Sequence, residues 1–226
     1  MTNISTDLLP SIVIETGDQP THSILWLHGL GADGNDFVPI VQELNLQSGI
    51  HIRFVFPHAP LQPVSINNGA VMRAWYDISG QNLSSDEDAA GIRASQSAVE
   101  KLIGREKQNG IKPENIVLAG FSQGGAIALH TGLRYPDKLA GILVLSSYLP
   151  LSETLIIDAH QSNASTRIFM AHGHNDPVIS PDLAISSKQK LLELGYSVNW
   201  NMYQMAHSVC NEEIADISKW LKQVLI

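Results

Sequence analysis

The sequence predicts an α/β fold in which a mostly parallel central sheet is covered by helices on both faces. Short apolar runs alternate along the chain with longer segments of helical pattern, which is the order that strand–helix–strand units produce. The chain has 226 residues, of which 44% are hydrophobic, and this is enough for one sizeable core. We therefore expect residues 1–226 to form a single domain.

Seven of the apolar runs are predicted to be strands, because each is short and lies between segments of different pattern. In chain order they are Ser11 to Glu15, Ser23 to Leu27, Ile52 to Phe56, Asn115 to Ala119, Gly141 to Leu145, Arg167 to Ala171 and Ser197 to Met202. Residues 61–80 follow neither period, so we expect a loop there with short extended pieces.

Five longer segments are predicted to be helices, and several of their ends have local causes. They are Asn35 to Leu46, Asp86 to Gln108, Gly124 to Tyr135, Pro181 to Leu194 and Glu212 to Val224. Ser85 can cap the long second helix, and Gly110 can end it in the left-handed conformation. Pro136 disfavours a helix at the residue before it, and Gly195 closes the fourth helix in the same way as Gly110.

Composition limits the function classes. The net charge is −8, from 14 basic and 22 acidic side chains, which argues against a nucleic-acid partner and a basic membrane-binding patch. The one cysteine, Cys210, excludes an internal disulfide. Residues 1–7 lack a signal pattern, and the apolar runs are too short to cross a bilayer. We expect a soluble protein of the cytoplasm.

The stretch from Gly120 to Gly125, with the sequence GFSQGG, is the most informative in the chain. It joins a predicted strand to a predicted helix and places Ser122 between two glycines, as in the nucleophile elbow G-x-S-x-G. Gly120 and Gly124 leave room for a sharp, strained turn and for close packing of helix on strand. The stretch therefore predicts Ser122 as a nucleophile.

A serine hydroxyl needs a base within hydrogen-bond reach, and the base needs an acid that orients it. In an α/β-hydrolase sheet these follow the serine in the order acid, histidine. Asp176 and His207 each come after a predicted strand, so we predict His207 as general base and Asp176 as its orienting acid. Taken singly, Asp176 could be a turn or cap residue, and His207 a surface histidine.

An oxyanion hole is predicted at residues 28–34, HGLGADG, which follow the second strand. Glycines let the backbone approach a developing negative charge, and the residue after the nucleophile supplies a second donor. The predicted donors are the N–H groups of Leu30 and Gln123. The alternatives are an ordinary turn or a phosphate-binding loop, and the phosphate loop is disfavoured because no lysine follows the glycines.

The irregular segment 61–80 is expected to border the acyl site. Val64, Met72 and Trp75 could present apolar surface to an acyl chain, and we take Met72 and Trp75 as candidate substrate-binding residues. The alternative is that Trp75 and Tyr76 pack in the core.

Two other classes of function compete with a serine hydrolase. His172, His174 and Asp176 have H-x-H-x-D spacing, which could belong to a metal hydrolase, but no companion motif supplies further ligands. We favour His172 and His174 as contacts that shape the acid loop, and we expect no metal. A non-catalytic binding protein is the second alternative, and the complete set of serine, acid, histidine and glycine loop argues against it.

Taken together, these motifs resemble the family of type II carboxylesterases and acyl-protein thioesterases. The resemblance runs from about Ile24 to Ile214 and rests on the segments LHGLG at 27–31, PHAP at 57–60, AWYDI at 74–78, GFSQGG at 120–125, HGHND at 172–176 and HSVC at 207–210. It implies an α/β-hydrolase fold, hydrolysis of carboxylic esters or acyl thioesters, and no cofactor. Ser122, Asp176 and His207 then correspond to the triad, and Leu30 with Gln123 to the oxyanion hole. The substrate would be a small ester, a lipid or an acylated protein, and a homodimer is one assembly to expect, because many members look like dimers.

Overall fold

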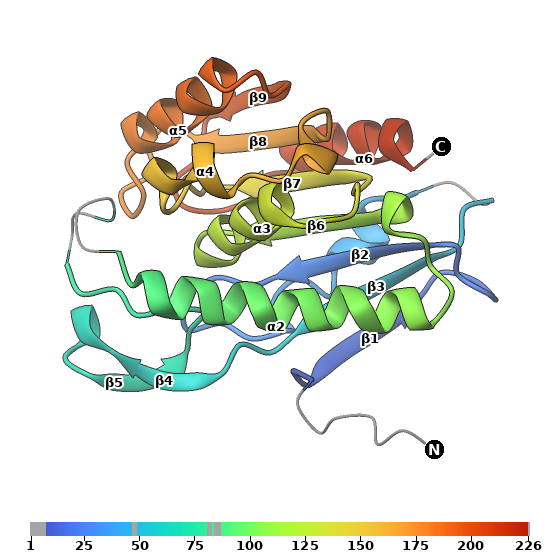
Figure 1. The fold of residues 1–226 in the computed structure, drawn as a ribbon, viewed down its shortest axis with the longest axis horizontal. Helices are drawn as coiled ribbons and strands as arrows, with labels where there is room; N and C mark the ends of the chain where they lie inside the picture. Colours follow the sequence, from blue (N-terminus) through green and yellow to red (C-terminus); the bar gives the residue numbers. More distant parts are fainter. Residues whose placement is uncertain (1–7, 47–48, 81–82, 84–86, 226) are drawn as a thin grey trace.

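A seven-stranded sheet forms the centre of the computed structural model, which describes residues 8–46, 49–80, 83 and 87–225. Its strands are β1 (Ser11–Glu15), β2 (His22–Leu27), β3 (Ile52–Pro57), β6 (Ile116–Phe121), β7 (Gly141–Leu145), β8 (Arg167–Gly173) and β9 (Val198–Tyr203). Their order across the sheet is β1-β3-β2-β6-β7-β8-β9 (Figure 1). Only the β1–β3 pair is antiparallel, so the predicted mostly parallel sheet is confirmed.

Helices cover both faces of the sheet, as the sequence predicts. They are α1 (Ile40–Glu43), α2 (Ala89–Gln108), α3 (Gln123–Arg134), α4 (Leu155–Asp158), α5 (Pro181–Glu193) and α6 (Asn211–Val224). In β2, Ile24 and Trp26 belong to the core that α1 and α6 cover, while Leu25 and Leu27 belong to the core under α2 and α3. This alternation is the two-residue period of a strand. Within the described part of the chain, no helix combines the length and the apolar composition that crossing a bilayer requires.

The irregular segment forms a hairpin outside the main sheet. Strands β4 (Leu61–Val64) and β5 (Ala70–Arg73) pair antiparallel, with a turn of 3₁₀ helix over Ser65–Asn67 between them. Figure 1 shows the hairpin near the start of α2. The expectation of short extended pieces within a loop is confirmed.

Two helix predictions are wrong at their N-terminal ends. The helix predicted from Asn35 is reduced to the four residues of α1, because Pro39 lacks an N–H and disfavours helical backbone at Val38. Helix α2 begins at Ala89, where the Asp88 side chain accepts a hydrogen bond from the Gly91 N–H. The predicted cap, Ser85, lies outside the described residues. The predicted glycine stops are confirmed, with φ values of +90° at Gly110 and +85° at Gly195.

Helix α6 carries a fully buried carboxyl group at Glu213. Burial raises its pKa to about 8, although the backbone N–H of Cys210 lowers it, because a charge is costly away from water. Between the ordinary pKa of 4.5 and this value, the carboxyl ionises in the unfolded chain and stays protonated in the native protein. Unfolding then releases a proton, so native stability falls as the pH rises through this window.

We therefore expect Glu213→Gln, which stays neutral, to raise the melting temperature by several degrees at pH 8 and by much less at pH 5. Thermal unfolding at both pH values checks this. Glu212→Gln, at the neighbouring exposed position, is the control and should show no such difference. An equal effect of Glu213→Gln at both pH values would contradict the assignment.

Candidate active site

The predicted nucleophile, acid and base come together at the carboxyl ends of parallel strands. Ser122 follows β6 directly, Asp176 follows β8 by three residues and His207 follows β9 by four. Because β6, β7, β8 and β9 are successive parallel neighbours, these ends share one edge of the sheet, where α/β folds place their sites.

Ser122 sits on a strained turn between β6 and α3. Its backbone has φ of +54° and ψ of −124°, a conformation that non-glycine residues rarely adopt. A Cβ at Gly120 would lie 2.3 Å from the Gly124 carbonyl, and one at Gly124 would lie 2.4 Å from the Leu27 carbonyl oxygen. Both glycines are thus required for the turn, as the sequence predicts.

Two hydrogen bonds connect the three side chains. Ser122 Oγ lies 2.9 Å from Nε2 of His207, and Nδ1 of His207 lies 2.7 Å from Oδ2 of Asp176. With the imidazole proton on Nδ1, the ring donates to the carboxylate and accepts from the serine hydroxyl. The Phe121 ring packs against the imidazole at 4.8 Å between ring centroids. A base held in this way can accept the serine proton during attack on an acyl carbon.

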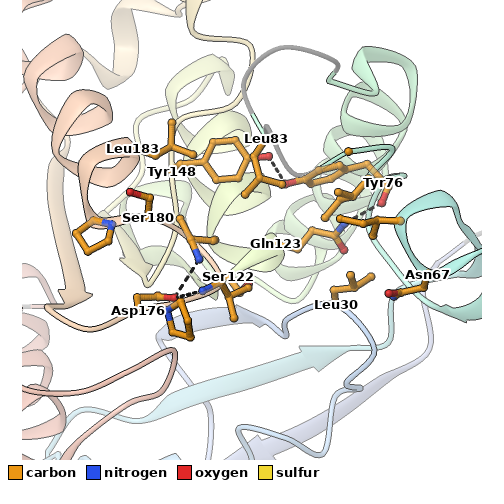
Figure 2. Close-up of a pocket in the computed structure, with 17 residues that line it drawn as sticks. Leu30, Asn67, Tyr76, Leu83, Ser122, Gln123, Tyr148, Asp176, Ser180 and Leu183 are labelled. Carbon is orange, nitrogen blue, oxygen red and sulfur yellow. Dashed lines mark hydrogen bonds between the residues drawn. The ribbon is translucent and has the colours of Figure 1, made fainter.

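The carboxylate of Asp176 is fixed on both oxygens. Oδ1 accepts from the backbone N–H groups of Val178, at 2.8 Å, and Ile179, at 3.0 Å, and these two bonds are drawn in Figure 2. Oδ2 faces His207 and also lies 3.3 Å from Nε2 of His172. The Asp176 side chain has no exposed surface, so the group that orients the base is shielded from water.

His172 and His174 have different environments. His172 is buried, its Nε2 lies 2.9 Å from the Ile179 carbonyl oxygen, and burial lowers its pKa. It is thus neutral and contacts the acid loop, as expected. The same expectation is wrong for His174, which is exposed and joins the loop through its backbone N–H to the Tyr203 carbonyl. Across the residues that the structure describes, no group of three or more His, Cys, Asp or Glu side chains is arranged to hold a metal ion.

The predicted oxyanion donors lie beside the serine. Leu30 and Gln123 line the same cleft as Ser122, and within the described chain neither backbone N–H donates to a protein acceptor. The glycine loop that carries Leu30 is fixed by histidines: His28 Nε2 accepts from the Ala59 N–H at 3.0 Å, and His58 Nδ1 accepts from the Gly34 N–H at 3.1 Å. The N–H groups of Leu30 and Gln123 are thus available to stabilise a negative charge that develops on a substrate oxygen.

The Gln123 side chain connects the oxyanion site to the cleft wall. Its Oε1 accepts from the Trp75 N–H at 2.8 Å, and its Nε2 donates to the Tyr76 carbonyl at 2.7 Å. Residues 75–76 are therefore held against the start of α3. This amide bridge joins segments 47 residues apart, and no local pattern in the sequence indicates it.

A cleft of about 960 Å³ opens beside Ser122 (Figure 2). Most of its wall is apolar, with side chains from residues 66–80 and Leu83 on one side and from the acid loop and the start of α5 on the other. The apolar members include Leu30, Ile66, Ile78, Leu83, Val178, Ile179 and Leu183. The expectation that segment 61–80 borders the site is correct.

Met72 and Trp75, the two residues of that segment that we expected to bind substrate, do not line this cleft. Trp75 is buried in the core, where its indole N–H donates to the His28 carbonyl at 2.9 Å, so the core-packing interpretation applies. Met72 lines a separate hollow with Gly31 and Arg73. The residues of the cleft come from the hairpin and from two loops that are distant in sequence. The helical and strand periods of the sequence do not indicate which residues of these segments face the cleft.

Comparisons with known proteins agree with the geometry. A family model described as Phospholipase/Carboxylesterase matches residues 10–225. Acyl-protein thioesterase 1 of Neurospora crassa is 38% identical over 225 residues, which cover 96% of this chain and 92% of that protein. The crystal structure of Arabidopsis thaliana SOBER1 has a TM-score of 0.86 at 33% identity, covering 91% of this chain and 99% of the other. Acyl-protein thioesterase 2 of Zea mays has a TM-score of 0.84 at 28% identity, with coverages of 96% and 99%.

Proposed function

Because this chain belongs to the phospholipase/carboxylesterase family, it is a serine hydrolase of carboxylic esters or acyl thioesters, and we propose that Ser122, His207 and Asp176 carry out the reaction. The observation that supports this assignment is the pair of hydrogen bonds from Ser122 to His207 and from His207 to Asp176. The geometry is that of a nucleophile, its base and an orienting acid.

In the proposed mechanism, Ser122 Oγ attacks the acyl carbon while His207 Nε2 takes the hydroxyl proton. The negative charge that develops on the acyl oxygen is stabilised by the N–H groups of Leu30 and Gln123. His207 then gives its proton to the leaving alcohol or thiol, which leaves an acyl group on Ser122. Water, deprotonated by His207, attacks this acyl-enzyme and releases the carboxylic acid.

The apolar cleft favours a substrate with a hydrocarbon acyl chain. We take the acyl group to lie in the cleft against Ile66, Ile78 and Leu183, where each buried methylene contributes about 0.8 kcal/mol. The name of the relatives, acyl-protein thioesterase 1, supports an acylated protein as substrate of this chain, and the family description, phospholipase/carboxylesterase, supports a lipid. We further propose that the protein acts in the cytoplasm and that a homodimer is one assembly to test for.

The test is kcat/KM on matched oxyesters and thioesters over a series of acyl lengths, together with labelling by a fluorophosphonate. We expect turnover of both ester types and one equivalent of label on Ser122. Labelling at another residue would contradict the assignment of the nucleophile. Absence of both turnover and labelling would contradict the proposed function.

A further inference from the structure

We propose that the hydrogen-bonded side chains of Tyr76 and Tyr148 form the end wall of the acyl cleft and limit the length of the acyl chain that the protein accepts. This inference rests on the proposed function, because it takes the cleft beside Ser122 as the place of the acyl group. It assigns chain-length specificity to two residues that take no part in the chemistry.

The two tyrosines meet across the cleft. Tyr76 follows the hairpin and Tyr148 follows β7, and their hydroxyl oxygens lie 2.9 Å apart. Figure 2 shows the hydroxyls pointing toward one another beside Leu83, on the side of the cleft away from Ser122 and Asp176. Both residues line the cleft and both are almost fully buried, so only a small part of each residue is exposed at the cleft wall.

A second, much smaller hollow adjoins the pair. Its volume is about 10 Å³, and Glu87 and Asp77 line it together with both tyrosines. Ile78, Gly80 and Leu83 line both spaces as well, so the tyrosines stand at the border between the cleft and the hollow. Removal of the Tyr148 ring would enlarge the cleft at this border.

The wall is held in place by hydrogen bonds on both sides. The Tyr76 carbonyl accepts from the Gln123 side chain, and the next N–H, of Asp77, donates to the Asp88 carboxylate at 3.0 Å. On the other side, the N–H of Leu149, next to Tyr148, donates to Ser187 Oγ at 2.9 Å. An acyl chain therefore meets a fixed barrier at this position.

The polar groups around the two hydroxyls oppose the passage of a longer acyl chain. Burial raises the pKa of Tyr148 to about 12 and the pKa of Tyr76 as well, so both phenols keep their O–H groups near neutral pH. The Glu87 carboxylate accepts from the Leu151 N–H at 2.9 and 3.0 Å. A methylene pushed past the rings would separate the paired hydroxyls and lie against polar groups, which is unfavourable. We thus expect kcat/KM to rise with acyl length, by about four-fold per methylene that fits, and then to stop rising.

The experiment compares wild type with Tyr148→Ala on p-nitrophenyl esters from butanoyl to dodecanoyl. The readout is the ratio of kcat/KM for the longest ester to that for the shortest, with active sites counted by fluorophosphonate labelling. The space that the Tyr148 ring leaves beside Ile78 and Leu83 should raise this ratio at least about ten-fold, because it would hold two or more further methylenes. Tyr148→Phe, which keeps the ring, should keep the wild-type ratio.

Tyr196→Ala removes a buried tyrosine from a different part of the core and is the matched control. The proposal is overturned if Tyr148→Ala changes the ratio no more than Tyr196→Ala does, or if Tyr148→Phe changes it as much as Tyr148→Ala. Should Tyr148→Ala not fold, Tyr148→Leu is read by the same criterion. If the wild-type protein turned over no ester, the proposed function itself would be wrong. If turnover were normal and the dependence on acyl length were unchanged in every variant, only the proposal that the two tyrosines limit acyl length would be wrong.

Discussion

Replacing Ser122 with alanine is expected to lower kcat by on the order of 10⁵- to 10⁶-fold. The hydroxyl that His207 Nε2 contacts at 2.9 Å would be lost, and with it the covalent acyl intermediate. KM should change little, because the cleft walls and the oxyanion donors stay in place. Initial rates on a short p-nitrophenyl ester, with active-site titration of the wild type, measure the loss.

Ser97→Ala is a suitable control, since Ser97 lies exposed on α2 and its hydroxyl donates to the Arg93 carbonyl of the same helix. It should keep the wild-type rate and labelling. If Ser122→Ala retained more than a small residual rate while its melting temperature matched wild type, Ser122 would not be the nucleophile.

The strands and the place of the three side chains could be predicted from the sequence because both depend on local signals. Apolar runs mark the strands, and in a parallel sheet the residues that follow them meet at one edge. Asp176 and His207 were therefore predictable from their positions after Ala171 and Met202, although the strands extend to Gly173 and Tyr203. Gly120 and Gly124 also indicated that the backbone makes a sharp turn at Ser122.

The cleft could not be predicted in the same way, because its wall depends on contacts between segments far apart in the chain. Trp75 and Tyr76 are adjacent in sequence, yet one packs under the glycine loop and the other faces Tyr148. The Gln123 amide bridge holds the backbone of both residues in this arrangement. Nothing in local period or propensity encodes this bridge, so Met72 and Trp75 were plausible from the sequence and wrong in the structure.

Asp176→Asn is expected to lower kcat by about 10⁴-fold, and the structure gives a specific reason. Oδ1 accepts two backbone N–H groups, from Val178 and Ile179, so the amide oxygen of an asparagine must occupy that position. Its NH₂ group then faces His207 in place of Oδ2. An N–H donor there pairs with an unprotonated Nδ1, which moves the imidazole proton to Nε2.

In that tautomer His207 cannot accept the proton of Ser122, and the imidazolium that would form loses its neighbouring charge. The size and shape of the residue are kept, so KM and the melting temperature should stay close to the wild-type values while kcat and the rate of fluorophosphonate labelling fall together. His172→Gln is the matched comparison, because His172 lies 3.3 Å from the same oxygen but does not touch the serine. We expect it to cost far less than Asp176→Asn. A loss of less than about ten-fold for Asp176→Asn would mean that the carboxylate does not set the tautomer of His207.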